Sequence, residues 1–270
     1  MSSRIIVPEL TKKRVKELAS QRRRIDKRGL TEFRPITIER GVIPQADGSA
    51  LVHIGRTKAI AGVKIDLGQP YPDMPNAGVL AVNVELMPLA SPTFEPGPPD
   101  ERAIEVARIV DRTIREGKMI DLEELVIIPG REVYVIFVDT YLVDHDGNMI
   151  DACVLASVAA LLDATMRKAI VSEGRARLIE EREPLPIRHY PLTATICRIG
   201  ETLIVDPILE EEETAEARIT IGFDEEGSIC MVQHSIGTLR YGELYQAINI
   251  SRETTLRLRE NLRKVFSNAS

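Results

Sequence analysis

An almost wholly apolar stretch after Asp151 limits the folds open to this chain more than any other feature. From Ala152 to Leu162 it reads Ala-Cys-Val-Leu-Ala-Ser-Val-Ala-Ala-Leu-Leu. We expect it to begin a helix over residues 151–170. A helix that is apolar on every side belongs in the interior of a protein. The rest of the chain must therefore supply packing layers around an internal helix.

Runs of β-type sequence stand before and after this segment. Before it, alternating or β-branched runs predict strands at 35–40, 50–54, 58–67, 79–87, 125–128 and 132–144. After it, similar runs predict strands at 192–198, 202–205, 218–223 and 229–234, and a closing helix at 241–266. Strands followed by a helix thus occur twice. This order is typical of an α+β (mixed α/β) chain with two pseudo-repeated halves.

The best internal boundary is the segment 171–191, which is rich in charged residues, proline and glycine. We therefore divide the chain into four parts. These are a basic N-terminal helix or arm (1–33), a first half (34–170), a linker (171–191) and a second half with the closing helix (192–270). The arm is either exposed, packed on a neighbouring subunit or in contact with RNA.

Composition narrows the class of protein. The chain has 270 residues and a net charge of −6, so nucleic acid would need a local basic patch or a partner. Its three cysteines are far apart, which argues for a reducing compartment and against a disulfide framework or a zinc site. The first residues lack the apolar core of a signal peptide, and no apolar run is long enough to span a membrane. We expect a cytoplasmic protein.

A proline-rich loop, Glu95–Pro99, precedes a charged helix. Asp100 is suited to cap this helix and Gly117 to end it. Ile104, Ala107, Val110 and Ile114 are expected to form its apolar face. The other face carries Glu101, Glu105, Arg108, Arg112 and Arg115. This charged stripe is either a solvated face that complements the helix dipole or a row of cations for phosphates.

The common catalytic motifs are absent. There is no Gly-x-x-x-x-Gly-Lys-Ser/Thr, Gly-x-Gly-x-x-Gly or His-Glu-x-x-His sequence. The four histidines do not stand at ligand spacing, and residues 210–213 are better explained as a solvated acidic turn than as a cation site. From motifs of this kind the sequence therefore predicts neither a cofactor nor a metal ion, and it gives no indication of an enzyme.

Several longer segments resemble the ribonuclease PH family. Near the start these are Asp-Lys-Arg-Gly-Leu-Thr-Glu-Phe-Arg-Pro (26–35), Ala-Asp-Gly-Ser-Ala-Leu-Val (46–52) and Gly-Arg-Thr-Lys-Ala-Ile-Ala-Gly-Val (55–63). Two more specific segments lie at 83–101 and 146–161. They are similar to the non-catalytic ribonuclease PH-like subunit of the archaeal exosome. The resemblance covers nearly the whole chain, from about Asp26 to the closing helix.

The resemblance implies a fold of two ribonuclease PH-like halves, each a mixed sheet with packed helices. It also implies a ring in which three copies of such a subunit alternate with three copies of a catalytic relative. That ring degrades RNA from the 3′ end with inorganic phosphate as the nucleophile. The partners expected are the catalytic subunit, RNA-binding cap subunits and single-stranded RNA.

Phosphorolysis requires cationic and backbone donors for the phosphate, and a carboxylate near the leaving oxygen. Active members of the family have an arginine pair where this chain reads Glu101-Arg102. They have Ser/Thr-Arg where it reads Met149-Ile150. Their two aspartates correspond to Glu212 and Arg218. Three elements of the phosphate and acid site are thus altered, which predicts a subunit without catalysis.

In the resembling subunit, the helix after the proline-rich loop holds RNA near the partner's active site. The resemblance therefore favours RNA contact for Arg108 and Arg112, and makes Arg115 a candidate. Two other functions stay open. One is a catalytic phosphate-dependent exoribonuclease, which would shorten poly(A) alone. The other is a monomeric RNA-binding module with a related fold, which would need no partner.

Overall fold

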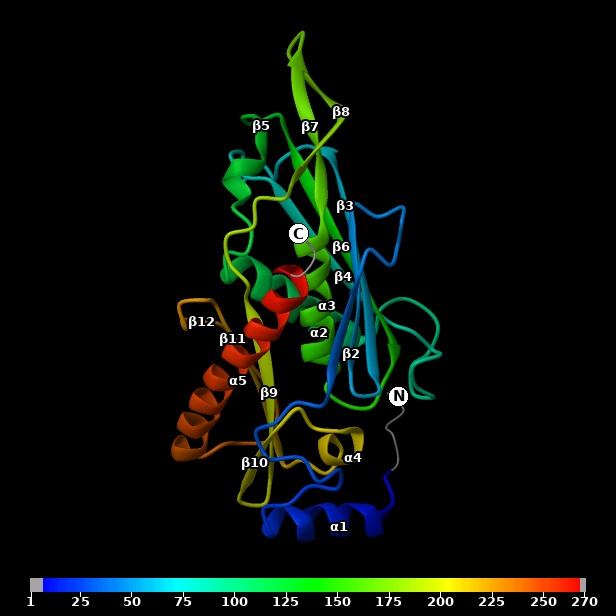
Figure 1. Cartoon of the computed structure of the whole chain (residues 1–270), viewed down its shortest axis with the longest axis vertical. Coiled ribbons are helices and arrows are strands. Elements are labelled where there is room, and N and C mark those ends of the chain that lie inside the picture. The colour runs from blue at the N-terminus through cyan, green and yellow to red at the C-terminus, as the bar shows by residue number, and fades with distance from the viewer. Residues whose placement is uncertain (1–6, 268–270) are drawn as a thin grey trace.

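The computed structural model describes residues 7–267 and places an apolar helix between two β-sheets (Figure 1). This helix, α3, spans Met149–Asp163, and its residues 149–161 are all buried. It packs on the first sheet and also on β9 (Leu192–Ile199) of the second. The prediction of an internal helix is therefore confirmed for this segment.

The first sheet has the strand order β1-β2-β3-β6-β4, with β5 added to β6. Only the β4–β6 pair is parallel. The strands are β1 (Ile36–Arg40), β2 (Gly48–Ile54), β3 (Thr57–Gly68), β4 (Val79–Leu86), β5 (Val126–Ile128) and β6 (Glu132–Asp144). A short 3-10 helix, η1 (Leu122–Leu125), leads into β5.

Helices cover one face of this sheet only. Alternate residues of β6, such as Ile136 and Val138, are fully buried in the core that also contains α3. Phe137 points to the other face and is 42% exposed. The apolar sequence of β6 predicts a strand covered on both faces, and this is wrong at Phe137. A continuous apolar run does not reveal which face a helix will cover.

The second sheet has the order β10-β9-β11-β12 and is antiparallel throughout. Its other strands are β10 (Thr202–Val205), β11 (Ala217–Phe223) and β12 (Ile229–Ile236). The closing helix α5 (Tyr241–Ser267) packs on β9 and β11. A second helix, α2 (Glu101–Glu116), lies beside α3 and contacts both β4 and β12.

The predicted helix over 151–170 ends too late. The helix α3 ends at Asp163, and the residues that follow form the strand β7 (Thr165–Ser172) instead. β7 forms a hairpin with β8 (Arg175–Pro184), inside the segment we expected to be a linker. Glu173 and Gly174 both have positive φ, as a two-residue hairpin turn requires. The division of the chain into arm, halves and linker stays a prediction.

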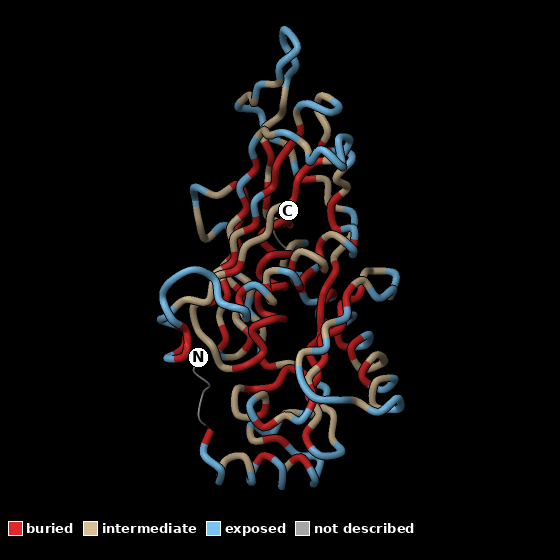
Figure 2. Tube along the Cα trace, turned by 180° about the vertical axis from the view of Figure 1, so that it is seen from behind, coloured by how far each residue is buried: buried red, intermediate tan, exposed pale blue. Residues whose placement is uncertain are grey.

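The N-terminal helix α1 (Glu9–Ser20) packs on the second half of its own chain. Val15 and Ala19 are buried against Ile199 and Ile204. Burial is concentrated in the middle of the molecule, whereas the tube is largely exposed at α1 and at the β7–β8 hairpin (Figure 2). Of the three readings of the arm, a fully exposed arm is wrong for α1, because a pair of small apolar residues anchors it.

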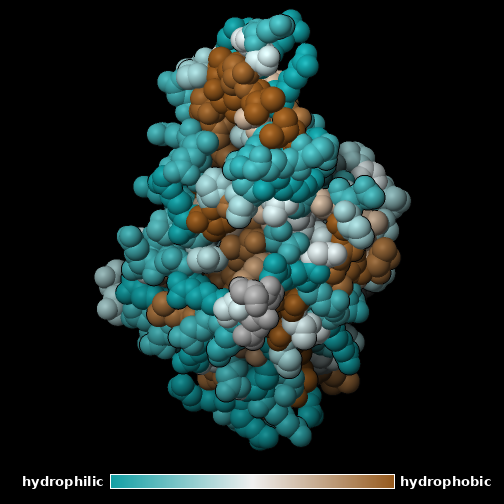
Figure 3. All heavy atoms as spheres, turned by 45° about the horizontal axis from the view of Figure 1, so that its top comes forward, coloured by the Kyte–Doolittle hydropathy of each residue, from teal (hydrophilic) through white to brown (hydrophobic). Residues whose placement is uncertain are grey.

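Apolar side chains are also exposed at the hairpin end of the molecule (Figure 3), where Ile170 and Val171 lie. None of the helices in residues 7–267 is long and apolar enough to cross a membrane.

Candidate functional site

The charged helix α2 begins as the sequence predicts. Asp100 has an extended backbone, and its carboxylate accepts a hydrogen bond from the Ala103 N–H at 2.9 Å. Glu101 is the first helical residue and is exposed. The predicted apolar face is only partly right, because Ile104 is 51% exposed. The buried residues are Ala103, Val106, Ile109, Val110, Thr113 and Ile114.

The three arginines of α2 differ in their surroundings. Arg108 is exposed, and its guanidinium has no hydrogen bond or ion pair with the described residues. Arg112 donates through Nη2 to Gln233 Oε1 at 2.9 Å. Arg115 is held by Asp111 at 2.8 Å and by the Leu80 carbonyl at 3.2 Å. The charge of Arg115 is thus largely neutralised, while Arg108 is free to meet an anion.

Arg112 is positioned by the second sheet. Gln233, on β12, donates to Glu105 Oε1 at 2.9 Å, and the Ser235 hydroxyl donates to the same oxygen at 2.9 Å. This chain of hydrogen bonds joins α2 to β12 and fixes the direction of the Arg112 side chain. The sequence gives no signal for Gln233, which is 121 residues from Arg112.

A shallow groove of about 300 Å³ runs between β4 and α2. Val82, Ile104 and Ala107 give it an apolar lining, and Arg108 and Arg112 also line it. The two arginines therefore border an open groove at the surface of the molecule.

A second cluster surrounds the N-terminus of α3. Met149 and Ile150 are its first two residues, and both are buried. Asn148, just before them, has a positive φ of 53°. Gly147 allows the close approach of the segment 207–209, because a Cβ there would lie 2.5 Å from the Pro207 carbonyl oxygen. The start of α3 thus faces the segment that leads into α4 (Leu209–Glu212).

Glu212 occupies the N-terminus of α3. Its Oε2 accepts a hydrogen bond from the Asn148 N–H at 2.8 Å, and its other oxygen forms an ion pair with Arg218. A carboxylate of the chain itself therefore fills the place where a helix N-terminus attracts an anion. Glu212 and Arg218, which we assigned to the altered acid site, neutralise each other.

Arg102 extends this cluster toward α2. Its guanidinium lies 5.0 Å above the Phe94 ring, and Phe94 packs on the His145 ring at 5.4 Å. Burial lowers the pKa of His145, although the nearby Glu212 carboxylate raises it. Met149, Ile150, Glu212 and Arg218 are thus brought together, whereas Glu101 forms no hydrogen bond or ion pair with them. Its neighbour Arg102 points its charge to this side instead.

A buried carboxylate, Asp206, holds these elements together, and sequence reasoning missed it. Asp206 accepts two hydrogen bonds from the Arg34 guanidinium, at 2.9 and 2.7 Å. It also accepts from Arg28 at 2.9 Å and from the Asn148 amide at 2.7 Å. Arg34 and Asp206 are 172 residues apart, so no local pattern signals their pairing.

Asp151 adds a second buried carboxylate beneath the first turn of α3. It accepts hydrogen bonds from Asn148, the Thr193 hydroxyl, and the Thr195 hydroxyl and N–H. Complete burial raises the pKa of Asp151 to about 6, against the lowering effect of these donors. Asp151 and Asp206 together tie α3 to β9 and to the end of β10.

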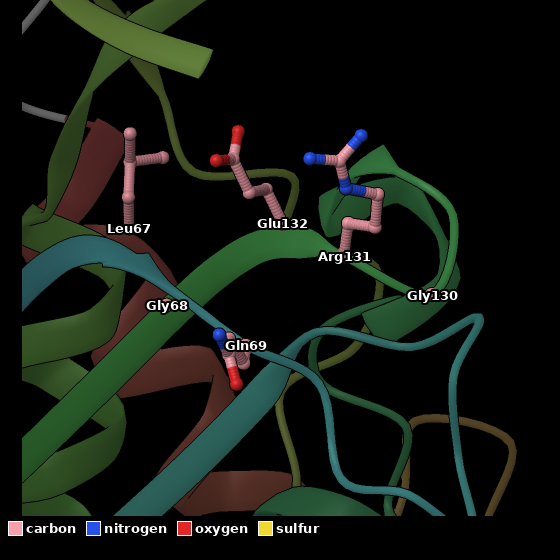
Figure 4. Close-up of a pocket in the computed structure, with 6 residues that line it drawn as sticks. All are labelled: Leu67, Gly68, Gln69, Gly130, Arg131 and Glu132. Atoms are coloured by element: carbon pink, nitrogen blue, oxygen red, sulfur yellow. The ribbon is translucent and has the colours of Figure 1, made fainter. Parts of the chain in front are cut away.

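Another pocket, of about 390 Å³, lies away from both clusters (Figure 4). It is formed at the end of β3 and the start of β6, and Gln69, Arg131 and Glu132 are its polar lining. None of the predicted site residues lines it. Within residues 7–267, no group of three or more His, Cys, Asp or Glu side chains is arranged to hold a metal ion.

Comparison with known proteins identifies the family. Residues 32–167 match the 3′ exoribonuclease family, domain 1, and residues 189–254 match domain 2 of the same family. The chain therefore belongs to the 3′ exoribonuclease family. The resemblance read from the sequence motifs and the predicted α+β fold are both confirmed.

Individual relatives are similar over almost their full length. The exosome complex component Rrp42 of Pyrococcus furiosus is 47% identical to this chain. The match covers 100% of this chain and 97% of that relative. The Rrp42 component of Methanothermobacter thermautotrophicus is 49% identical over 96% of each chain. Among solved structures, a chain of the Archaeoglobus fulgidus exosome with RNA bound to the active site has a TM-score of 0.86 and 40% identity. The match covers 94% of this chain and 98% of that one.

Proposed function

We infer that this chain is a non-catalytic, RNA-contacting subunit of an exosome ring. Its catalytic partner is a ribonuclease PH-like subunit that degrades RNA from the 3′ end with phosphate. The similarity to Rrp42 components over nearly the whole chain supports the assignment to this complex. RNA-binding cap subunits and a cytoplasmic location belong to the same proposal.

The pairing of Glu212 carries the non-catalytic part of the proposal. An attacking phosphate needs free donors, and active family members place them at the start of the helix equivalent to α3. Here the Asn148 N–H and the Arg218 guanidinium are both engaged by Glu212. Met149 and Ile150 supply neither a hydroxyl nor a cation, and both are buried. A second anion at this place would be repelled by the Glu212 carboxylate.

We expect this chain to assemble with its catalytic relative into a closed ring. Co-expression of the two chains, followed by size-exclusion chromatography with light scattering, should give roughly six ribonuclease PH-like chains per particle. Obligate interfaces of this kind bury about 2,000 Å² or more, so the ring should persist on dilution. A heterodimer that stays dimeric at micromolar concentration would contradict the ring, and a chain that ignores the relative would contradict the whole assignment.

Arg108 and Arg112 are proposed to hold the RNA backbone that leads into the partner's active site. They lie one helical turn apart, about 6 Å along the axis, which suits successive phosphates. Changing both to Ala in the assembled ring should weaken RNA binding and flatten the dependence of log affinity on log salt by about 1.4 units, since each phosphate contact contributes about 0.7. Arg115 should contribute less, because Asp111 already pairs with it.

A matched control is Arg257→Ala with Lys264→Ala, two exposed cations of α5 without an ion pair among the described residues. Affinity is measured by fluorescence anisotropy with labelled oligo(U) over a salt series. The ring should assemble in both variants, because the buried face of α2 is unchanged. If the α2 variant binds RNA as the control does, the arginines are only a solvated face.

A further inference from the structure

Positive charge is concentrated in α1 and the turn that follows it. Residues 9–28 contain nine Lys and Arg against three Asp and Glu, a net charge of +6, whereas the whole chain carries −6. The rest of the molecule is therefore strongly acidic. This segment occupies one end of the molecule, opposite the β7–β8 hairpin and apart from α2 (Figure 1).

Two of these nine cations hold the segment to the rest of the chain through buried or partly buried side chains. Arg24 is buried, and its Nε donates to Glu211 at 3.0 Å while Nη1 donates to the Val205 carbonyl at 2.8 Å. Arg28 donates to Asp206 at 2.9 Å. Together with the apolar contacts of Val15 and Ala19, they fix α1 in place.

The other cations take little or no part in folding. Lys12 and Lys16 form exposed pairs with Glu9 and Glu216, at 3.6 and 3.5 Å. Pairs of this kind contribute little to stability. Five more are exposed and have no ion pair or side-chain hydrogen bond with the described residues. These five form what we call the N-terminal basic surface: Lys13, Arg14, Arg22, Arg23 and Lys27.

Neighbouring like charges that form no ion pair oppose folding slightly, so the folded chain alone gives no reason for the N-terminal basic surface. Its backbone is nevertheless fixed by the buried Arg24 contacts. The five cations are therefore presented on a rigid support, which reduces the entropy lost when a ligand binds. A flexible polyanion is the kind of ligand that such a support fits.

We propose that the N-terminal basic surface binds the phosphate backbone of single-stranded RNA, as a second contact separate from α2. The choice of RNA as the polyanion rests on the proposed function; the existence of the surface does not. Because most of the molecule is acidic, a strand should be attracted at α1 and α2 and repelled elsewhere. Two contacts on one strand act together, since binding at one raises the effective concentration at the other.

The test uses the full chain with Lys13, Arg14 and Arg23 all changed to Gln. Lys13 and Arg14 lie in α1, where Gln is about as favourable as Lys or Arg, and the exposed Arg23 lies beyond its end, so α1 should stay folded. With labelled oligo(U) at about 50 mM salt, the triple variant should bind about tenfold or more weakly than the parent. Its slope of log affinity against log salt should be flatter by about 2 units, for three contacts of about 0.7 each. Circular dichroism and thermal melting check that α1 remains docked.

The control removes the same charge elsewhere, through Arg131→Gln, Arg257→Gln and Lys264→Gln, which are exposed and unpaired among the described residues. Equal weakening in both variants would mean that only net charge matters, and the proposal would be wrong. It would also be wrong if the parent did not bind RNA, or if the triple variant bound RNA normally but failed to join the ring. That last result would mean that the N-terminal basic surface binds an acidic protein rather than RNA.

The variant with Arg108 and Arg112 changed to Ala is measured in parallel, so that failure of the α2 contact is distinguished from failure of the N-terminal contact.

Discussion

Replacing Asp206 with Ala should lower the free energy of unfolding by about 3–5 kcal/mol, because it removes the nearest carboxylate partner of the buried Arg34 guanidinium. Asp206 is fully buried and accepts hydrogen bonds from Arg34, Arg28 and Asn148. Arg34 is itself buried, so its guanidinium is shielded from bulk water. The remaining hydrogen-bond acceptors of the Arg34 guanidinium are the carbonyls of Asp146 and Gly147 and the Thr57 hydroxyl, which carry no full charge. The Asp146 carboxylate, at 3.8 Å, is a longer ion pair and replaces the lost one only in part.

Urea denaturation of the full chain measures the effect, and Asp206→Asn tests its origin. Asn keeps the shape of the side chain but removes its charge, so this variant should also lose stability. The control is Glu201→Ala, which breaks an exposed pair with Arg240 at 3.3 Å and should change stability by less than about 1 kcal/mol. If Asp206→Ala lowers the free energy of unfolding by less than about 1 kcal/mol, the stability of the fold does not depend on this carboxylate.

The isolated chain should release no nucleoside diphosphate from oligo(A) when it is incubated with phosphate and magnesium. Phosphorolysis needs an anion held in line with the scissile bond. At the start of α3 the Asn148 N–H and Arg218 already bind Glu212, and Met149 and Ile150 offer no donor side chain. Thin-layer or liquid chromatography of the products, compared with a buffer control, measures the release.

Glu212→Ala separates the two causes of inactivity. This variant frees the Asn148 N–H and Arg218, yet it should stay inactive because the hydroxyl and the cation of active relatives are still missing at 149 and 150. The positive control is the ring formed with the catalytic relative, which should release diphosphates in the same assay. Release by the isolated parent chain well above the buffer control would instead make this chain a catalytic exoribonuclease.

The sequence predicted most elements because their signals are local. Alternation and turn residues placed the strands of both sheets within about two residues, and Asp100 capped α2 as expected. The helix after Asp151 was predicted but not its end, since Thr165–Ser172 becomes a strand only by pairing with β8. The exposure of Ile104 was missed, because helical spacing shows which residues share a face. It does not show how much of that face is covered by neighbouring elements.

The candidate site was predicted only in part. The altered positions 149, 150, 212 and 218 do meet at the start of α3, while Glu101 does not join them. The proposed RNA contacts at Arg108, Arg112 and Arg115 stay predictions. Their surroundings favour Arg108 and Arg112 over Arg115, because Asp111 already neutralises Arg115. The residues that sequence reasoning overlooked, Asp206, Arg34 and Gln233, act through partners more than 100 residues away.

The sequence by itself determined the family, the order of elements and the need for an internal helix, because apolar pattern and motif order are properties of a linear chain. Only the tertiary structure decided that Glu212 fills the N-terminus of α3, that Asp111 neutralises Arg115 and that the Arg108 guanidinium has no partner within residues 7–267. It also decided that α1 docks on its own chain through Arg24. Whether a charge is paired depends on which distant side chains the fold brings within hydrogen-bond distance, and no local spacing specifies that.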